Sequence, residues 1–194
     1  MSPLRIAVII GSTRPGRKGR AVAEWVLEHA QDRPGASYEL IDLLDHPLPH
    51  LDEPIPASAG RYQHDHTRRW AETIAGYDGF IFVTPEYNHS TTGVLKNAID
   101  YLHNEWHNKA AAFVGYGVVG AARAVEHLRG ILSEVQVAHV RQAMAFSFFN
   151  DFQDFTKFTP GDHHLQYLPV MLDQLEAWAG ALKPLREQPE ASAA

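Results

Sequence analysis

The sequence predicts an α/β fold in which helices cover both faces of a five-stranded parallel sheet. Short and almost wholly apolar runs at 5–10, 79–84 and 109–114 are typical of strands that are buried on both faces. Segments with apolar residues at helical spacing separate and follow these runs. Strands that alternate with helices are typical of a parallel sheet, and 194 residues fit a single domain.

The predicted elements alternate along the chain. Including two weaker candidates with partial alternation, the predicted strands are 5–10, 37–41, 79–84, 109–114 and 136–140. The predicted helices, of which 67–75 is the weakest, are 20–31, 67–75, 91–102, 119–132 and 168–182. The last one carries an i, i+3, i+4, i+7 apolar stripe from Leu168 to Leu182, and Pro184 is expected to end it.

Two segments do not fit this alternation. Residues 42–60 contain four prolines and no periodicity, which predicts an irregular loop. Residues 146–158 contain six of the nine phenylalanines. We expect these two segments to frame the entrance of the functional site, or the phenylalanines simply to cover the core. The domain is expected to span 1–185, with a flexible tail over 186–194.

Composition excludes several classes of function. The chain has no cysteine, so disulfides and thiolate chemistry are excluded, and redox chemistry would require a bound cofactor. With a net charge of −6 and one basic cluster, it is a poor candidate for binding nucleic acid. No signal-peptide core and no apolar run long enough to span a bilayer is visible. We therefore expect a cytoplasmic protein without nucleic-acid or membrane partners.

The loop after the first strand predicts an anion site. Its sequence, GSTRPGRKGR, places four of the seventeen cations within residues 14–20. A tight turn before a helix N-terminus presents backbone N–H groups to an anion. The loop lacks the patterns that bind nucleoside triphosphates or dinucleotides, so a phosphate monoester fits best. The expected donors, with solvated surface charges as the alternative, are Ser12, Thr13, Arg14, Arg17 and Lys18.

The loops after the third and fourth strands are expected at the same sheet edge, where α/β proteins bind ligands. In the first of them, Tyr87 can stack on a flat ligand, and Gly93 lets the backbone approach it. The other, GYGVVG at 115–120, matches GxGxxG, but 136–149 contains no acidic residue that a dinucleotide site would need. We interpret it as a backbone wall beside a planar ligand, or as a plain turn.

The twelve histidines do not predict a metal site. His103 and His107 stand i, i+4 near a helix end, but no third ligand is placed by spacing. The pairs at 163–164 and 64–66 are expected to be solvated in loops. The metal prediction is therefore none.

Three motifs together resemble a known family. GSTRPGR, PEYNHSTTGVLKNAIDYL and GYGVVGAARAVEHLR, in this order and spacing, resemble the NADPH-dependent FMN reductase family, which includes azo dye, quinone and chromate reductases. The likeness runs from Leu4 to about Leu182, and residues 85–100 match the middle motif at every fixed position. It implies a flavodoxin-like three-layer sandwich with strand order 2-1-3-4-5, and a homodimer or homotetramer.

The resemblance also implies roles for the three loops. The first loop, with Ser12, Arg14, Arg17 and Lys18, would hold the FMN phosphate. The flavin ring would be lined by Pro85, Glu86, Tyr87, Asn88, Gly93, Gly115, Tyr116 and Gly117. A single cationic loop also favours FMN over FAD, which would need a second site for its pyrophosphate and adenine.

These observations predict an enzyme. It would transfer hydride from NADPH or NADH through bound FMN to free flavin, quinone or azo acceptors by a ping-pong mechanism, with no catalytic side chain because the flavin N5 carries the chemistry. The alternative is a flavodoxin-like carrier that receives electrons from a protein partner. The arginine-rich loop and the lack of a strongly acidic face favour the enzyme.

Overall fold

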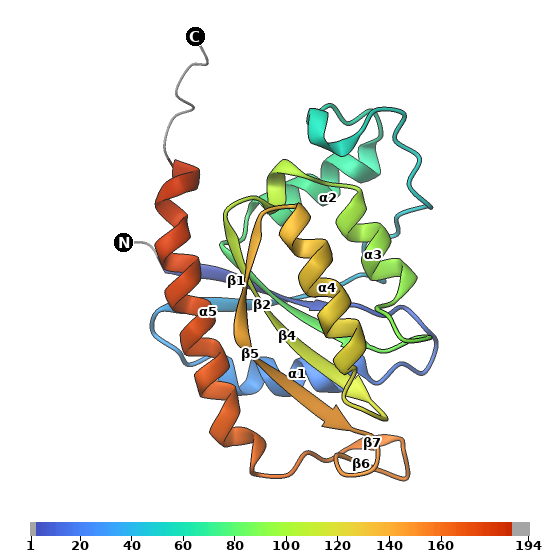
Figure 1. Ribbon diagram of the computed structural model, residues 1–194, viewed down its shortest axis with the longest axis vertical. Coiled ribbons are helices and arrows are strands. Elements are labelled where there is room, and N and C mark those ends of the chain that lie inside the picture. Colours follow the sequence, from blue (N-terminus) through green and yellow to red (C-terminus); the bar gives the residue numbers. More distant parts are fainter. Residues whose placement is uncertain (1–2, 188–194) are drawn as a thin grey trace.

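A computed structural model describes residues 3–187 and contains one five-stranded parallel sheet in the order β2-β1-β3-β4-β5 (Figure 1). Its strands are β1 (Leu4–Ile10), β2 (Ala36–Asp42), β3 (Gly79–Pro85), β4 (Lys109–Gly117) and β5 (Val137–Ser147). The predicted fold class and strand order are confirmed.

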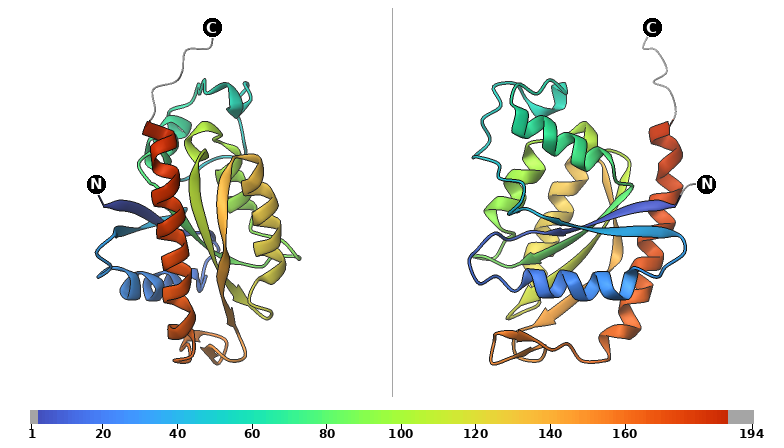
Figure 2. Two further views of the ribbon diagram at one scale, coloured as in Figure 1. Left: turned by 60° about the vertical axis from the view of Figure 1, so that its left-hand side comes forward. Right: turned by 180° about the vertical axis from the view of Figure 1, so that it is seen from behind.

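The helices form a layer on each face of the sheet, as the two views of Figure 2 show. One layer contains α1 (Gly19–Ala30) and α5 (His164–Glu187), and the other contains α2 (Asp65–Ala75), α3 (Gly93–Asp100) and α4 (Ala122–Glu134). Two short 3₁₀ turns lie in connections between the sheet and the second layer: Ala57–Ala59 between β2 and α2, and Asn104–Trp106 between α3 and β4. Within residues 3–187, no helix is long and apolar enough to cross a membrane.

The central strands hold the two layers together because their side chains alternate between the faces. Ile6 and Val8 of β1 pack in the cluster of α1 and α5, whereas Ala7 and Ile9 pack in the cluster of α2, α3 and α4. All four side chains are fully buried. This explains why residues 6–10 form a continuous apolar run and show no alternation.

The structure differs from the prediction in β5, which is much longer than residues 136–140. The pairing with β4 changes register between His139 and Ala143, and this bulge interrupts the period-2 pattern that identifies a strand. At the bulge, side chains provide hydrogen-bond partners for backbone groups of β5. Arg129 Nη1 donates to the Val140 carbonyl at 2.8 Å, and the Gln142 N–H donates to Gln174 Oε1 at 3.0 Å.

The phenylalanine-rich segment is partly regular. It begins in β5 and continues into a small antiparallel hairpin of β6 (Phe152–Gln153) and β7 (Lys157–Phe158). Phe146 and Phe152 are buried in the core, while Phe149 and Phe155 are exposed. The core-covering alternative therefore holds for some of these residues.

The prediction that the last helix ends at Pro184 is wrong. The helix α5 continues to Glu187 because its last turn is held by tertiary contacts. Arg186 Nη1 donates to the Asn108 carbonyl at 2.5 Å and its Nη2 pairs with Asp78, while Lys183 Nζ lies 3.2 Å from Asp78 Oδ2. Residues 186 and 187 of the expected tail are thus helical, and 188–194 lie outside the described residues.

Candidate functional site

The loops after β1 and β3 meet where the strand order reverses. In the sheet, β2 lies on one side of β1 and β3 lies on the other. The connections that follow β1 and β3 therefore run in opposite directions, and a crevice forms between them at the carboxyl ends of the two strands. The Gly11 N–H donates to the Val83 carbonyl at 2.8 Å, and Thr92 Oγ1 donates to the Gly11 carbonyl. Ser12 Oγ and Tyr87 Oη share a hydrogen bond of 3.0 Å. The two loops therefore form one connected unit.

A cavity of about 500 Å³ lies over this crevice. Nine of the thirteen predicted site residues line it: Arg14, Arg17, Lys18, Pro85, Glu86, Tyr87, Asn88, Tyr116 and Gly117. The other lining residues, outside the thirteen, are Pro15, Gly16, His89, Val118, Val119, Arg123 and Phe148. Its size is that of a site for a cofactor or a small molecule.

The first loop brings positive charge to the cavity. Arg14 and Lys18 line it and form no ion pair with any described residue. The helix α1 begins directly after Lys18, which makes no side-chain cap, and its first turn contains no acidic residue. The free N–H groups and the helix dipole add to the positive potential of the loop.

Arg17 differs from the other two cations. Its Nη2 pairs with the carboxylate of Asp42 at the end of β2, and only 13% of the Arg17 side chain is exposed. Its Nε is buried without a partner. Arg17 therefore connects the loop to β2 and retains one unused donor.

The loop after β3, the second loop of the site, turns sharply after Glu86. Tyr87 and Ser90 exchange two backbone hydrogen bonds of 2.9 and 3.1 Å, and the residues between them, Asn88 and His89, have φ angles of 49° and 68°. Positive φ at both central residues is the conformation of a type I′ turn. The left-handed region is tolerable for Asn but costs His about 1 kcal/mol, so this turn is strained at the cavity wall.

Glu86 fixes the second loop to α4. Its carboxylate accepts from Arg123 Nε at 2.5 Å and from the Arg123 N–H at 3.1 Å. Because the N-cap residue Ala121 offers no side-chain acceptor, Glu86 serves as the cap of α4 from another loop. Burial opposes ionisation, but the bonds from Arg123 hold the pKa of Glu86 below its ordinary value.

The end of β4 and the loop that follows it, the third loop of the site, contribute backbone groups and the Tyr116 ring to the cavity. The Tyr116 side chain is buried, and its Oη has no hydrogen-bond partner. Gly117 has a φ of 152°, which side chains rarely adopt. A Cβ on Gly115 would lie 2.1 Å from the Gly120 carbonyl oxygen, so the packing of the chain itself explains the glycine at 115.

Four predicted residues lie off the cavity lining. Ser12 and Gly115 are buried, Thr13 is half-buried, and Gly93 is exposed at the start of α3. Of these, Ser12 still supports the site through Tyr87.

The proposed frame of the entrance is only partly present within one chain. Phe148 lines the cavity, whereas Phe152, Phe155 and residues 42–60 do not. The phenylalanine-rich composition of 146–158 thus pointed to one residue of the cavity wall, Phe148. Arg123 carried no signal, because its role depends on a contact with Glu86 across the fold.

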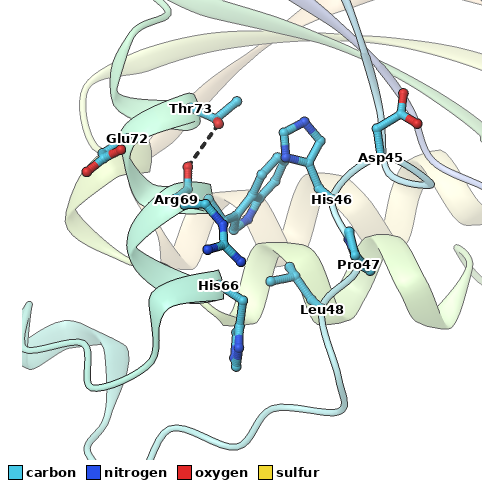
Figure 3. Close-up of a pocket in the computed structure, with 9 residues that line it drawn as sticks. Asp45, His46, Pro47, Leu48, His66, Arg69, Glu72 and Thr73 are labelled. Carbon is cyan, nitrogen blue, oxygen red and sulfur yellow. Dashed lines mark hydrogen bonds between the residues drawn. The ribbon is translucent and has the colours of Figure 1, made fainter.

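Part of the proline-rich loop lines a different cavity, of about 530 Å³, against α2 (Figure 3). His46 lies against Trp70 with the ring centroids 5.1 Å apart, and burial lowers the pKa of His46. None of the thirteen predicted site residues lines this cavity.

The strand order and a ligand cavity at the reversal point define the class of flavodoxin-like proteins. Comparison with known proteins gives the family. The sequence model of NADPH-dependent FMN reductases matches residues 4–151, so the chain belongs to this family. The predicted class of enzyme, an oxidoreductase with FMN as flavin and NAD(P)H as co-substrate, is confirmed at this level.

Individual relatives agree with this assignment. An NAD(P)H-dependent FMN reductase of Schizosaccharomyces pombe is 40% identical over 145 residues, which are 72% of each chain. An NAD(P)H:quinone oxidoreductase of Solanum tuberosum is 34% identical over 93% of this chain and 95% of the relative. Among solved structures, the NAD(P)H:(acceptor) oxidoreductase FerB of Paracoccus denitrificans has a TM-score of 0.72 and 25% identity, and the match covers 92% of this chain and 98% of FerB.

Proposed function

We propose that the cavity binds FMN, with the phosphate at the first loop and the flavin ring between the second and third loops. The observation that carries this proposal is the set of unused donors around one cavity. Arg14 and Lys18 have no acidic partner among the described residues, and Arg17 Nε and Tyr116 Oη are buried without a hydrogen bond. A single phosphate next to the start of α1 matches these donors in charge and number.

The residues of the chain then have the following roles. Arg14 and Lys18 neutralise the phosphate, with Thr13 as a further hydroxyl donor at the same loop. Tyr87 lies beside the ring in an orientation held by Ser12. The exposed apolar side chains of Val118 and Val119 exclude water from the cavity rim.

Bound FMN supplies the acceptor for a hydride from a nicotinamide, so the chain needs no acid or base for that step. Its contribution is binding, orientation and electrostatics. Backbone N–H groups of the loops at Asn88 and Gly117 would donate hydrogen bonds to the pyrimidine edge of FMN. One open site, used first by the nicotinamide and then by the acceptor, implies a ping-pong mechanism.

The proposed acceptors are quinones, free flavin and azo compounds. Relatives named 2-hydroxy-1,4-benzoquinone reductase and NAD(P)H:quinone oxidoreductase support quinones among them. The second candidate is a carrier that takes electrons from a protein partner, and the match to the NADPH-dependent FMN reductase family favours the enzyme over it.

The decisive experiment is anaerobic reduction. Stoichiometric NADPH, and separately NADH, is added to the FMN-loaded protein, and the visible flavin absorbance is followed. Rapid bleaching supports the reductase and identifies the preferred donor. A flavin that binds but stays oxidised with both donors contradicts it and favours the carrier. Parallel double-reciprocal lines with a quinone acceptor would test the ping-pong order.

We further propose a homodimer or homotetramer that works in the cytoplasm. Exposed apolar side chains beside the cavity, Val118, Val119 and Phe149, support assembly near the site. Light scattering of the purified protein would measure the mass, and a monomer at micromolar concentration would contradict the proposal. Fractionation of the native cells would test the location.

A further inference from the structure

Three potential metal ligands converge on the side of the molecule where the β6–β7 hairpin joins α5. Asp151 comes from the turn after β5, and His163 and His164 come from the start of α5. One carboxylate oxygen and one ring nitrogen of each histidine all lie within 4.8 Å of one another. This is the one such group of three or more His, Asp or Glu side chains found in residues 3–187.

Two members of the group are buried and held in place. The side chains of Asp151 and His164 are only 3% and 8% exposed, and His164 Nε2 lies 2.8 Å from Asp151 Oδ1. The other carboxylate oxygen of Asp151 accepts from the Ser147 N–H at 2.8 Å. The His164 ring also packs on Phe146 with a centroid distance of 4.4 Å. Outer contacts of this kind orient metal ligands in proteins.

The third member completes the group from the solvent side. His163 is exposed, and its ring lies 4.0 Å from that of His164. A Cβ on Gly161 would come within 2.8 Å of His163 Nδ1, so the glycine leaves room for the ring in this position. The expectation that both histidines are solvated is therefore wrong for His164 and correct for His163.

We propose that Asp151, His163 and His164 form a Zn²⁺ site with water in the fourth position. Two imidazole nitrogens and one carboxylate oxygen are a common ligand set for Zn²⁺, with bonds of about 2.0–2.2 Å and therefore ligand atoms about 3.4 Å apart. The Zn²⁺ ion takes the place of the hydrogen bond between His164 Nε2 and Asp151 Oδ1, and the exposed His163 rotates inward.

The site has a structural consequence for the flavin cavity. The Zn²⁺ ion would connect α5 to the turn of residues 147–151, and this turn contains Phe148, which lines the cavity. The Phe148 N–H also donates to the Gly117 carbonyl at 3.0 Å. Metal binding would thus stabilise one wall of the cavity without contacting its ligand. The proposed metal ligands do not line the flavin cavity.

The test uses the full chain without an affinity tag, cleared of metal by a chelator and titrated calorimetrically with ZnCl₂. We expect one Zn²⁺ per chain at the tightest site, and no comparable binding of Mg²⁺, which prefers oxygen ligands. His163→Ala should weaken the Zn²⁺ affinity at least about tenfold. Because His163 is exposed, this variant should fold like the parent, which circular dichroism checks.

Two controls separate this site from adventitious binding by other histidines. His50→Ala removes an exposed histidine outside the group and should leave affinity and stoichiometry unchanged. His103→Ala disrupts the His103–His107 pair, whose rings lie 4.5 Å apart, and should also have no effect on the tightest site. Equal Zn²⁺ binding by the parent and His163→Ala, or loss of the tightest site in His103→Ala, would overturn the proposal.

A spectroscopic measurement identifies the ligands directly. Co²⁺ substitutes for Zn²⁺ and gains visible absorption in a four-coordinate site. The band should appear with the parent chain, be lost with His163→Ala, and persist with His50→Ala. No band with the parent chain, together with no saturable Zn²⁺ binding, would show that Asp151 and His164 form only a buried hydrogen-bonded pair.

Discussion

Charged side chains gather at both ends of the sheet. At the amino end they pair with one another, whereas at the carboxyl end some of them have no partner within the described residues. At the amino end, Asp78 accepts from the Arg5 N–H at 3.0 Å and pairs with Lys183 and Arg186. There Lys109 Nζ also donates to the Ile74 carbonyl at 2.7 Å. At the carboxyl end, Arg14 and Lys18 have no such partners among the described residues, and Tyr116 Oη has none.

The paired charges at the amino end stabilise the fold, whereas the unpaired donors at the carboxyl end are available to bind a ligand. Charged groups buried in a structure are normally paired, because an unpaired one costs the desolvation of the charge. Where buried donors such as Arg17 Nε and Tyr116 Oη remain unused at a cavity, the missing partner is expected to come from outside the chain. Four experiments can break or sharpen this comparison.

The largest effect is expected at Asp78. Asp78→Asn leaves Lys183 and Arg186 without their counterion and should lower the free energy of unfolding by about 3 kcal/mol, measured by urea denaturation. Asp100→Asn, which breaks an exposed pair with Lys96, should cost less than about 1 kcal/mol. Flavin affinity should be unchanged in both. Equal costs for the two variants would contradict the structural role of the amino end.

Next comes the pH dependence at Lys109. Burial lowers the pKa of Lys109 from 10.5 to about 7. Between these values the unfolded chain holds a proton that the folded chain has released, so stability should rise with pH across this window. The free energy of unfolding of the parent, relative to Lys109→Met, should rise by about 2 kcal/mol or more from pH 7 to 10. A constant difference would show that Lys109 stays charged.

At the carboxyl end, Arg14→Ala should weaken FMN binding by about 1–3 kcal/mol and leave stability nearly unchanged, because the Arg14 side chain is exposed and forms no ion pair with a described residue. Fluorescence titration of FMN measures the affinity. Arg20→Ala is the matched control, since Arg20 belongs to the same basic cluster but pairs with Glu24 outside the cavity lining. Equal losses in the two variants would remove Arg14 from the proposed phosphate site.

The smallest effect is expected at the strained turn. His89→Gly should raise the free energy of unfolding by up to about 1 kcal/mol, because glycine adopts the φ of 68° without strain. His89→Ala removes the same ring but keeps the strain, so it should give no gain. Thermal denaturation compares the two. A similar gain in both would locate the cost in the imidazole ring.

The sequence predicted the parallel sheet because it depends on local patterns, and loop patterns together with the family resemblance predicted nine of the lining residues. Apolar runs mark buried strands, and the loops that follow neighbouring parallel strands must meet at one edge. It did not predict contacts that join distant segments. The bulge of β5 needs Arg129 and Gln174, the extension of α5 needs Asp78, and the metal-ligand group needs Asp151 next to His163. None of these pairings follows a sequence period.

Close packing at Gly115 and Gly120 means that these two positions require glycine, whereas the two exposed valines between them can be substituted. A Cβ at Gly120 would lie 2.7 Å from Ala145 Cβ, and one at Gly115 would meet the Gly120 carbonyl, so neither position accepts another amino acid. Val118 and Val119, between them, are 59% and 50% exposed at the cavity rim. A mutant library selected for new electron acceptors should therefore retain both glycines and collect its useful variation at these two valines.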